Sequence, residues 1–156
     1  MDKPERQVRH GGPDDAAAVA RLLHDFNEEY DEPTPGVARL VEIVTAMFAA
    51  GEITVLLVGD GPDGISVLRF RTAIWTGGPE AHLQEFYVVP ALRGRGIGRV
   101  LLEASMEVAR EAGATGIDLN TGATDTAARA LYESSGFTNR EGSADGPSML
   151  FYEREL

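Results

Sequence analysis

The sequence predicts one mixed α/β domain, in which four helices flank a central, mostly antiparallel sheet. Two observations carry this prediction. Apolar residues recur at helical spacing in four segments, and six short runs rich in β-branched and aromatic residues lie around them. The order is strand, two helices, three strands, helix, strand, helix, strand. No repeat or linker interrupts the 156 residues, so we expect a single domain over residues 1–156.

The first half begins with a short strand over residues 6–11. A helix over 12–30 follows, with Asp14 or Asp15 available as its cap. Its apolar positions are Ala17, Val19, Leu22, Leu23 and Phe26. Two prolines in residues 31–36 end it, because proline disrupts a helix interior. A second helix over 37–51 ends at Gly51.

The second half begins with three strands over residues 52–60, 65–76 and 80–89. Turn clusters rich in glycine and proline separate them, which predicts an antiparallel meander. The remaining elements are a helix, a strand, a helix and a closing strand, over 98–113, 114–121, 124–136 and 147–156.

Composition limits the functional classes. The formal charge of −11 argues against nucleic acid as a partner and favours a cationic small molecule, although it also serves solubility alone. There is no cysteine, hence no disulfide and no thiolate metal site. The polar start does not fit a secretory signal, and no apolar run reaches the roughly 18 residues of a membrane helix. We therefore expect a cytoplasmic protein without a membrane or metal partner.

The stretch VVPALRGRGIGRVLLEAS, residues 88–105, places glycines and arginines between a strand and a helix. A Walker loop would end in Lys-Ser or Lys-Thr, which is absent. A dinucleotide fingerprint would put its third glycine at Arg99, although Asp118 lies at a suitable distance downstream. The pattern R-x-x-G-x-G is met by Arg93, Gly96 and Gly98. Its backbone N–H groups can converge on a pyrophosphate; the alternative is a tight turn with solvated arginines.

Residues 82–137 resemble the GNAT family of N-acetyltransferases. V-x-P, R-x-x-G-x-G and A-x-x-L-Y-E-x-x-G-F occur in that order. The resemblance implies a twisted sheet of about six to seven strands, splayed where acyl-CoA inserts, with acetyl-CoA as co-substrate and no metal. Asp125 stands where the family usually has asparagine, which puts one pantetheine contact in doubt. The implied cofactor-binding residues are Phe86, Tyr87, Val88, Arg93, Gly94, Arg95, Gly96, Ile97, Gly98, Arg99 and Asp125.

The resemblance also implies catalytic roles. Tyr132 matches the tyrosine that protonates the departing thiolate, and a backbone N–H near Val88 polarises the acetyl carbonyl. The alternative for Tyr132 is a half-buried aromatic residue. His82 and Glu85 are candidates for the base that deprotonates the amine, with a water chain as the alternative. Strict alternation puts these two on opposite faces of the strand, and only a β-bulge would bring them together.

We expect direct transfer of acetyl to a primary amine of a small, cationic acceptor. Residues 25–32 supply five acids for such a substrate, and this region is similar to aminoglycoside-modifying members; a solvated acidic surface is the alternative. Other functions kept open are a non-catalytic acyl-CoA sensor and an N-terminal or peptide amine acetyltransferase. A nucleotide-binding regulator is disfavoured by Arg99 and the missing Walker lysine. A homodimer is compatible with the sequence.

Overall fold

A computed structural model describes residues 7–156. Residues 1–6, which include Arg6 of the predicted opening strand, lie outside the described residues. The chain divides into two compact units, residues 1–119 and 120–156. The single domain over 1–156 therefore stays a prediction.

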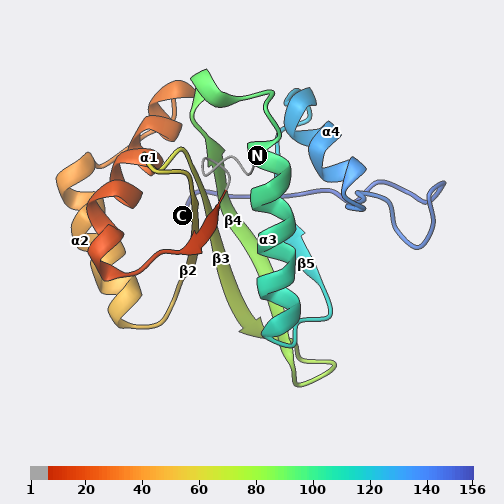
Figure 1. Cartoon of the computed structure of the whole chain (residues 1–156). Coiled ribbons are helices and arrows are strands. Elements are labelled where there is room, and N and C mark those ends of the chain that lie inside the picture. Colours follow the sequence, from red (N-terminus) through yellow and green to blue (C-terminus); the bar gives the residue numbers. More distant parts are fainter. Residues whose placement is uncertain (1–6) are drawn as a thin grey trace. The chain divides into compact units, whose positions relative to one another are not determined.

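The first unit holds the central sheet and three α-helices (Figure 1). Short 3-10 turns precede two of the helices, η2 (Pro13–Asp15) before α1 and η3 (Pro90–Leu92) before α3. The elements are β1 (Val8–His10), α1 (Ala16–Glu29), α2 (Val37–Ala49), β2 (Thr54–Val58), β3 (Gly64–Thr72), β4 (Pro79–Val88), α3 (Ile97–Glu111) and β5 (Ile117–Leu119).

The sheet of the described residues has five strands in the order β1-β2-β3-β4-β5. Neighbouring strands are antiparallel except β4 and β5, which are parallel. This confirms the mixed α/β fold and the meander of β2, β3 and β4. The long parallel connection from β4 to β5 runs through α3, as a parallel pair requires.

Each face of the sheet is covered by its own apolar core. On one face, α1 and α2 pack Val19, Leu22 and Val44 against alternating residues of β2, β3 and β4. On the other, Ile97 and Leu101 of α3 pack on the intervening residues of β2. The predicted apolar positions of the first helix hold except Ala17, which is exposed while Ala16 is buried. The two faces are called the α1/α2 face and the α3 face below.

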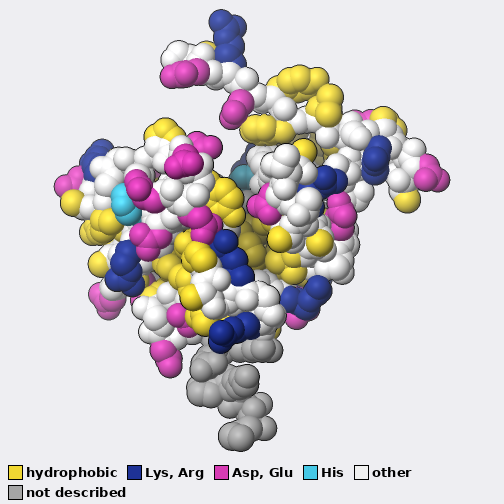
Figure 2. Space-filling model, turned by 90° about the horizontal axis from the view of Figure 1, so that it is seen from above, with side chains coloured by type: hydrophobic (Ala, Val, Ile, Leu, Met, Phe, Trp, Pro, Cys, Tyr) yellow, Lys and Arg dark blue, Asp and Glu magenta, His cyan; other side chains and the backbone are white. Residues whose placement is uncertain are grey.

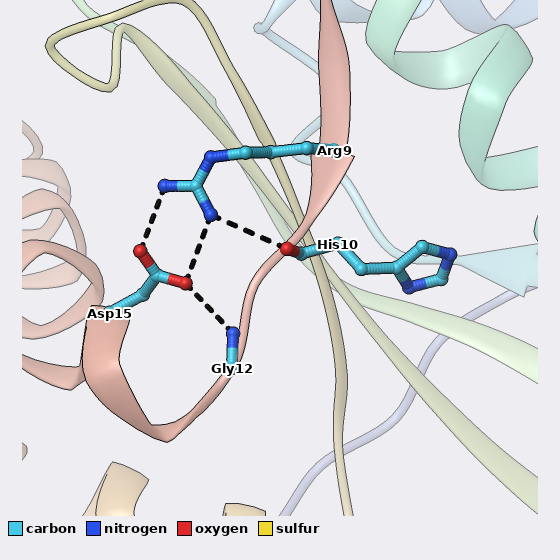
Figure 3. Close-up of polar contacts among 4 residues, drawn as sticks. All are labelled: Arg9, His10, Gly12 and Asp15. Atoms are coloured by element: carbon cyan, nitrogen blue, oxygen red, sulfur yellow. Dashed lines mark hydrogen bonds and ion pairs between the residues drawn. The ribbon is translucent and has the colours of Figure 1, made fainter.

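The entrance to α1 is fixed by Asp15, but not as a helix cap. Its carboxylate accepts hydrogen bonds from both terminal nitrogens of Arg9, at 3.0 and 2.8 Å, and from the Gly12 N–H at 2.8 Å (Figure 3). These donors hold the pKa of Asp15 below its ordinary value, Arg9 contributing most. Asp15 is the N-cap residue of α1, yet its side chain makes no capping hydrogen bond. It ties β1 to the turn before the helix instead.

The second strand of the meander ends earlier than predicted. β3 ends at Thr72, and residues 73–78 form the turn of the hairpin, closed by a hydrogen bond from Ala73 N–H to the Gly78 carbonyl at 2.8 Å. Ile74 and Trp75, which were expected in the strand, are 90% and 96% exposed. Gly77 adopts a φ of +71° in this turn, a left-handed conformation that favours glycine.

The second unit contains α4 (Thr126–Ser134) and an extended tail. Asp125 caps α4, accepting a hydrogen bond from Ala128 N–H at 3.1 Å. The predicted closing strand over 147–156 is wrong: the segment forms one isolated bridge, Arg140 with Ser148. Consequently the described residues contain five strands rather than six to seven. A strand needs a neighbour for its backbone groups, and alternation in sequence does not supply one.

No helix among residues 7–156 combines the length and apolar character needed to cross a membrane.

Candidate active site

β4 carries a β-bulge at the point where the site was predicted. Val67 of β3 lies opposite Glu85, whereas the next residue, Leu68, lies opposite Leu83, so Gln84 is the extra residue. His82 is opposite Arg69 and Glu85 opposite Val67, and these β3 residues are two apart. Directly opposed residues share a face, and so do residues two apart. The bulge thus puts His82 and Glu85 together on the α1/α2 face.

The side chains of His82 and Glu85 also interact electrostatically. Glu85 is partly buried, and this burial raises the pKa of its carboxyl group, while the positive charge of His82 opposes the rise. A carboxyl group with a raised pKa and a neighbouring imidazole is a pair suited to proton transfer. Both residues predicted as candidate bases, His82 and Glu85, therefore lie on the same face of β4.

Beyond the bulge, one edge of β4 has no neighbouring strand among the described residues. β5 pairs with Ala81, His82 and Leu83 and then ends. The Val89 N–H bonds back to the Asp63 carbonyl at 2.9 Å, so by alternation the backbone groups of Phe86 and Val88 point to the opposite edge. Tyr87 points its backbone toward β3. Of the three residues predicted to line the splayed edge, two have the required backbone direction.

The glycine loop, residues 93–98, leads from η3 into α3. Gly94 and Gly96 have φ values of +76° and +83°, in the left-handed region that favours glycine. Gly96 is the N-cap of α3 and provides no side-chain cap, so the N–H groups of the first helical turn are left without an intrahelical partner. Arg95 and Arg99 are exposed on either side of this turn. The loop has the backbone geometry of an anion-binding turn.

Arg93 differs from the other two arginines. Its Nε donates to the Val88 carbonyl at 2.9 Å, and its Nη2 donates to Glu29 of α1 at 2.7 Å. The guanidinium also lies over the ring of Tyr87, 5.5 Å from the ring centre. The side chain predicted to bind pyrophosphate is thus directed toward the end of α1.

The acidic end of α1 lies beside β4 at this point. Tyr87 is buried and stacks on Phe26, with ring centres 5.0 Å apart. Burial raises the pKa of the Tyr87 hydroxyl; the charges of Glu29 and Asp25 raise it further, and Arg93 opposes them. Viewed from above, acidic side chains gather over the side that carries α1 and α2 (Figure 2). Part of the predicted acid cluster therefore faces the strand that carries His82 and Glu85.

One residue of the site was not predicted. Asp118 of β5 lies opposite His82 in the parallel register, and its Oδ1 is 2.5 Å from His82 Nδ1. In the sequence, Asp118 matches only the spacing of a ribose-binding acid, in a dinucleotide fingerprint that Arg99 disfavours. No local pattern could have paired it with His82, because the pairing depends on the register of two strands.

In the second unit, Tyr132 lies on α4 and is 8% exposed. Its ring meets Phe137 edge to face, with centres 5.9 Å apart. The carboxylate of Asp125 is engaged in capping α4. The contacts predicted for Tyr132 and Asp125 with acyl-CoA stay predictions.

The described residues thus bring together an open β4 edge, a glycine loop at a helix N-terminus and an acid–imidazole pair on one face of β4. The sequence matches the acetyltransferase (GNAT) family over residues 19–137. It is 30% identical over 139 residues to an aminoglycoside N(6')-acetyltransferase type 1 of Stenotrophomonas maltophilia, covering 86% of this chain and 87% of that enzyme. The chain belongs to the acetyltransferase (GNAT) family, and it is an acetyltransferase.

Two further relatives agree with this assignment. Mycothiol acetyltransferase of Beutenbergia cavernae is 38% identical over 85 residues, which are 53% of this chain but 27% of that protein. A crystal structure of a protein from Arthrobacter sp. FB24, assigned to the acetyltransferases, is 41% identical with a TM-score of 0.89 and covers 100% of this chain and 99% of that one. The resemblance stated from residues 82–137 is confirmed. Family members generally use acetyl-CoA as co-substrate.

Proposed function

We propose that this acetyltransferase moves an acetyl group from acetyl-CoA to a primary amine of a small, cationic acceptor by direct attack. The observation that carries the proposal is the bulge at Gln84, which puts His82 and Glu85 on one face of β4 where the strand loses its neighbour. An acceptor on that face and a donor along the open edge would bring amine and acetyl group together. Such positioning alone accounts for a large part of a transfer rate.

The donor side uses backbone groups. The pantetheine arm extends along the β4 edge as an added strand, bonding to the backbone of Phe86 and Val88. The Val88 N–H then polarises the acetyl carbonyl and stabilises the oxyanion that forms there. The pyrophosphate lies on the first turn of α3, where Arg95 and Arg99 add positive charge.

The acceptor side uses acidic and aromatic groups. The negative charges of Glu29 and Asp25 raise the pKa of the Tyr87 hydroxyl, and the Tyr87 ring stacks on Phe26. Carboxylates beside aromatic faces attract ammonium groups. The relation to an aminoglycoside acetyltransferase over most of both chains supports a polycationic acceptor.

The chemistry needs one base and one acid. The acceptor arrives as an ammonium ion, and Glu85 or His82 removes its proton before the amine nitrogen attacks the acetyl carbon. The C–S bond breaks, and Tyr132 protonates the leaving thiolate. No covalent intermediate is required. The cytoplasmic location and the homodimer stay predictions from the sequence.

The test is CoA release from acetyl-CoA with a panel of amines: kanamycin, spermidine, lysine and a short peptide with a free N-terminus. Turnover with kanamycin or spermidine alone is the expected result. Turnover restricted to the peptide or lysine would overturn the cationic acceptor and demote Asp25 and Glu29 to surface charges. Failure of acetyl-CoA to bind, measured by calorimetry, would overturn the donor assignment.

A further inference from the structure

Asp118 belongs to neither the sequence motifs nor the predicted site, yet it makes the closest side-chain contact to His82. The two residues are register partners in the parallel pairing of β4 and β5. His82 Nδ1 lies 2.5 Å from Asp118 Oδ1. The strands therefore place this carboxylate through their backbone, rather than through a flexible loop.

A second charged group lies beside the carboxylate. Arg71 Nη2 lies 3.9 Å from Asp118 Oδ2, and the same guanidinium bonds through Nε to Glu80 Oε1 at 2.5 Å. One Asp118 oxygen thus faces arginine and the other faces histidine. The side chains of His82 and Asp118 are 32% and 62% exposed. An exposed ion pair of this kind contributes little to the free energy of folding, which leaves a catalytic role to consider.

The contact has a chemical consequence for the imidazole. A carboxylate accepts a hydrogen bond, so Nδ1 carries the hydrogen that it donates to Asp118. Nε2 is then the nitrogen with the lone pair, and it has no hydrogen-bond partner among residues 7–156. Glu85 lies on the same face because of the bulge at Gln84.

We propose that Asp118 is a positioning residue, which holds His82 in the tautomer whose Nε2 accepts the proton of the acceptor ammonium. This inference rests on the proposed function. It assigns the base to His82, with Asp118 stabilising the imidazolium that forms. In this role Asp118 touches neither substrate.

The proton balance is closed without a further reactant. Nε2 takes one proton from the ammonium group, and the freed nitrogen pair attacks the acetyl carbon. As the C–S bond breaks, the nitrogen loses a second proton to become the amide, which balances the proton that the thiolate takes up. The imidazolium then returns its proton to solvent. The charged groups facing His82 are Asp118 from β5, Glu85 from β4 and Arg69, its register partner on β3. Around these groups, Glu52 pairs with Arg69, Arg71 with Asp118, and Glu80 with Arg71.

The experiment uses the whole chain and begins with a readout that needs no acceptor. The protein has three histidines, and His82→Gln identifies the ring signals of His82 in nitrogen-detected NMR spectra. In the wild type, we expect the Nδ1–H tautomer to dominate at a pH where the ring is neutral. In Asp118→Asn we expect a mixture, because an amide can donate to Nδ1 as well as accept from it. A dominant Nε2–H tautomer in the wild type would overturn the proposal.

Kinetics then separate this inference from the proposed function. With acetyl-CoA and the amine that turns over fastest among kanamycin, spermidine, lysine and the peptide, Asp118→Asn should lower kcat about 10-fold, with KM nearly unchanged. That loss is a fraction of the roughly 10²–10⁴-fold that a general base supplies. Asp118→Glu should restore part of it. Glu42→Gln, in the exposed Arg39–Glu42 pair of α2, is the matched control and should keep the wild-type rate.

The outcomes are distinguishable. A wild-type rate in Asp118→Asn or in His82→Gln, while the wild type acetylates an amine, would overturn the role of Asp118 and leave the proposed function standing. Turnover of no amine would overturn the proposed function and with it the kinetic role of Asp118. Slower turnover in Asp118→Asn with an unchanged pH profile and unchanged tautomer would overturn positioning, since a purely structural loss lowers the rate at every pH alike.

Discussion

Glu29 near the end of α1 and Arg93 at the start of the glycine loop are joined by a 2.7 Å ion pair, although 64 residues separate them in sequence. The same guanidinium holds the Val88 carbonyl and covers the Tyr87 ring. One arginine therefore links the acidic end of α1, the strand edge and the loop. In the proposed function, this position would couple the acceptor side of the site to the donor side.

Replacing Arg93 by alanine should affect the acceptor more than the donor. We expect a higher KM for a cationic amine, because the end of α1 loses its tie to β4. The free energy of unfolding should fall by no more than about 1 kcal/mol, since the pair is partly exposed and screened. Calorimetry with acetyl-CoA should show a smaller loss of affinity than in Arg99→Ala. A larger loss would mean that the Arg93 guanidinium binds the pyrophosphate after all.

Gly96 gives a sharper test of the donor side. With φ at +83°, a valine here is strained by about 1–2 kcal/mol and places a branched side chain where the pyrophosphate is proposed to lie. Gly96→Val should lower both the stability and the affinity for acetyl-CoA.

The other end of the same helix supplies the control for Gly96. Gly113 follows α3 with φ at +88°, and an added Cβ would meet nothing closer than Pro79 Cγ at 3.7 Å. Gly113→Val should cost similar stability and leave acetyl-CoA affinity unchanged. Equal losses of affinity in both variants would refute the loop assignment, because strain alone would then explain them.

The sequence predicted the parts of this fold that local patterns encode. Helical and strand periodicity placed α1, α2, α3 and α4 and the meander, because each pattern reports which side of an element faces the core. From the spacing of His82 and Glu85, the sequence indicated that only a β-bulge would put both side chains on one face. The structure has such a bulge at Gln84.

The remaining features depend on contacts between distant segments. His82 and Asp118 are 36 residues apart and meet through strand register, which no local pattern sets. The direction of Arg93 depends on Glu29 in another helix. The predicted closing strand over 147–156 failed for a related reason: Met149, Leu150, Phe151 and Tyr152 have strand-like character but are exposed, without a neighbouring strand in the described chain.

Ser66 and Ser105 predict an asymmetric effect on stability. Both are fully buried, their Oγ atoms are 2.7 Å apart, and Ser105 donates to the Leu101 carbonyl at 2.8 Å. Ser66 must therefore donate to Ser105. Ser105→Ala leaves a buried hydroxyl without a partner and should cost about 1–3 kcal/mol. Ser66→Ala should cost about 1 kcal/mol, because Ser105 keeps its acceptor.

Urea unfolding of the two single variants and of the double variant measures this coupling. The double variant should be less destabilised than the sum of the singles, since no hydroxyl is then left unsatisfied. Additive costs, or a larger cost for Ser66→Ala, would contradict the assigned direction of the hydrogen bond.

Glu85 predicts a pH-dependent stability. Burial raises its pKa in the folded state above the ordinary value of 4.5, and His82 offsets part of the rise. Between 4.5 and the raised pKa the folded state keeps a proton that the unfolded state has lost, so this group lowers stability as pH rises through that window. Glu85→Gln lacks the penalty. Its free energy of unfolding, relative to the wild type, should therefore increase from pH 4 upward and level off above the folded pKa.

Urea unfolding at a series of pH values measures the difference, and Glu103→Gln on the exposed side of α3 is the control. A difference that stays constant with pH, or decreases, would mean that the folded state does not raise the pKa of Glu85. It would then argue against Glu85 as a proton-transfer partner of His82.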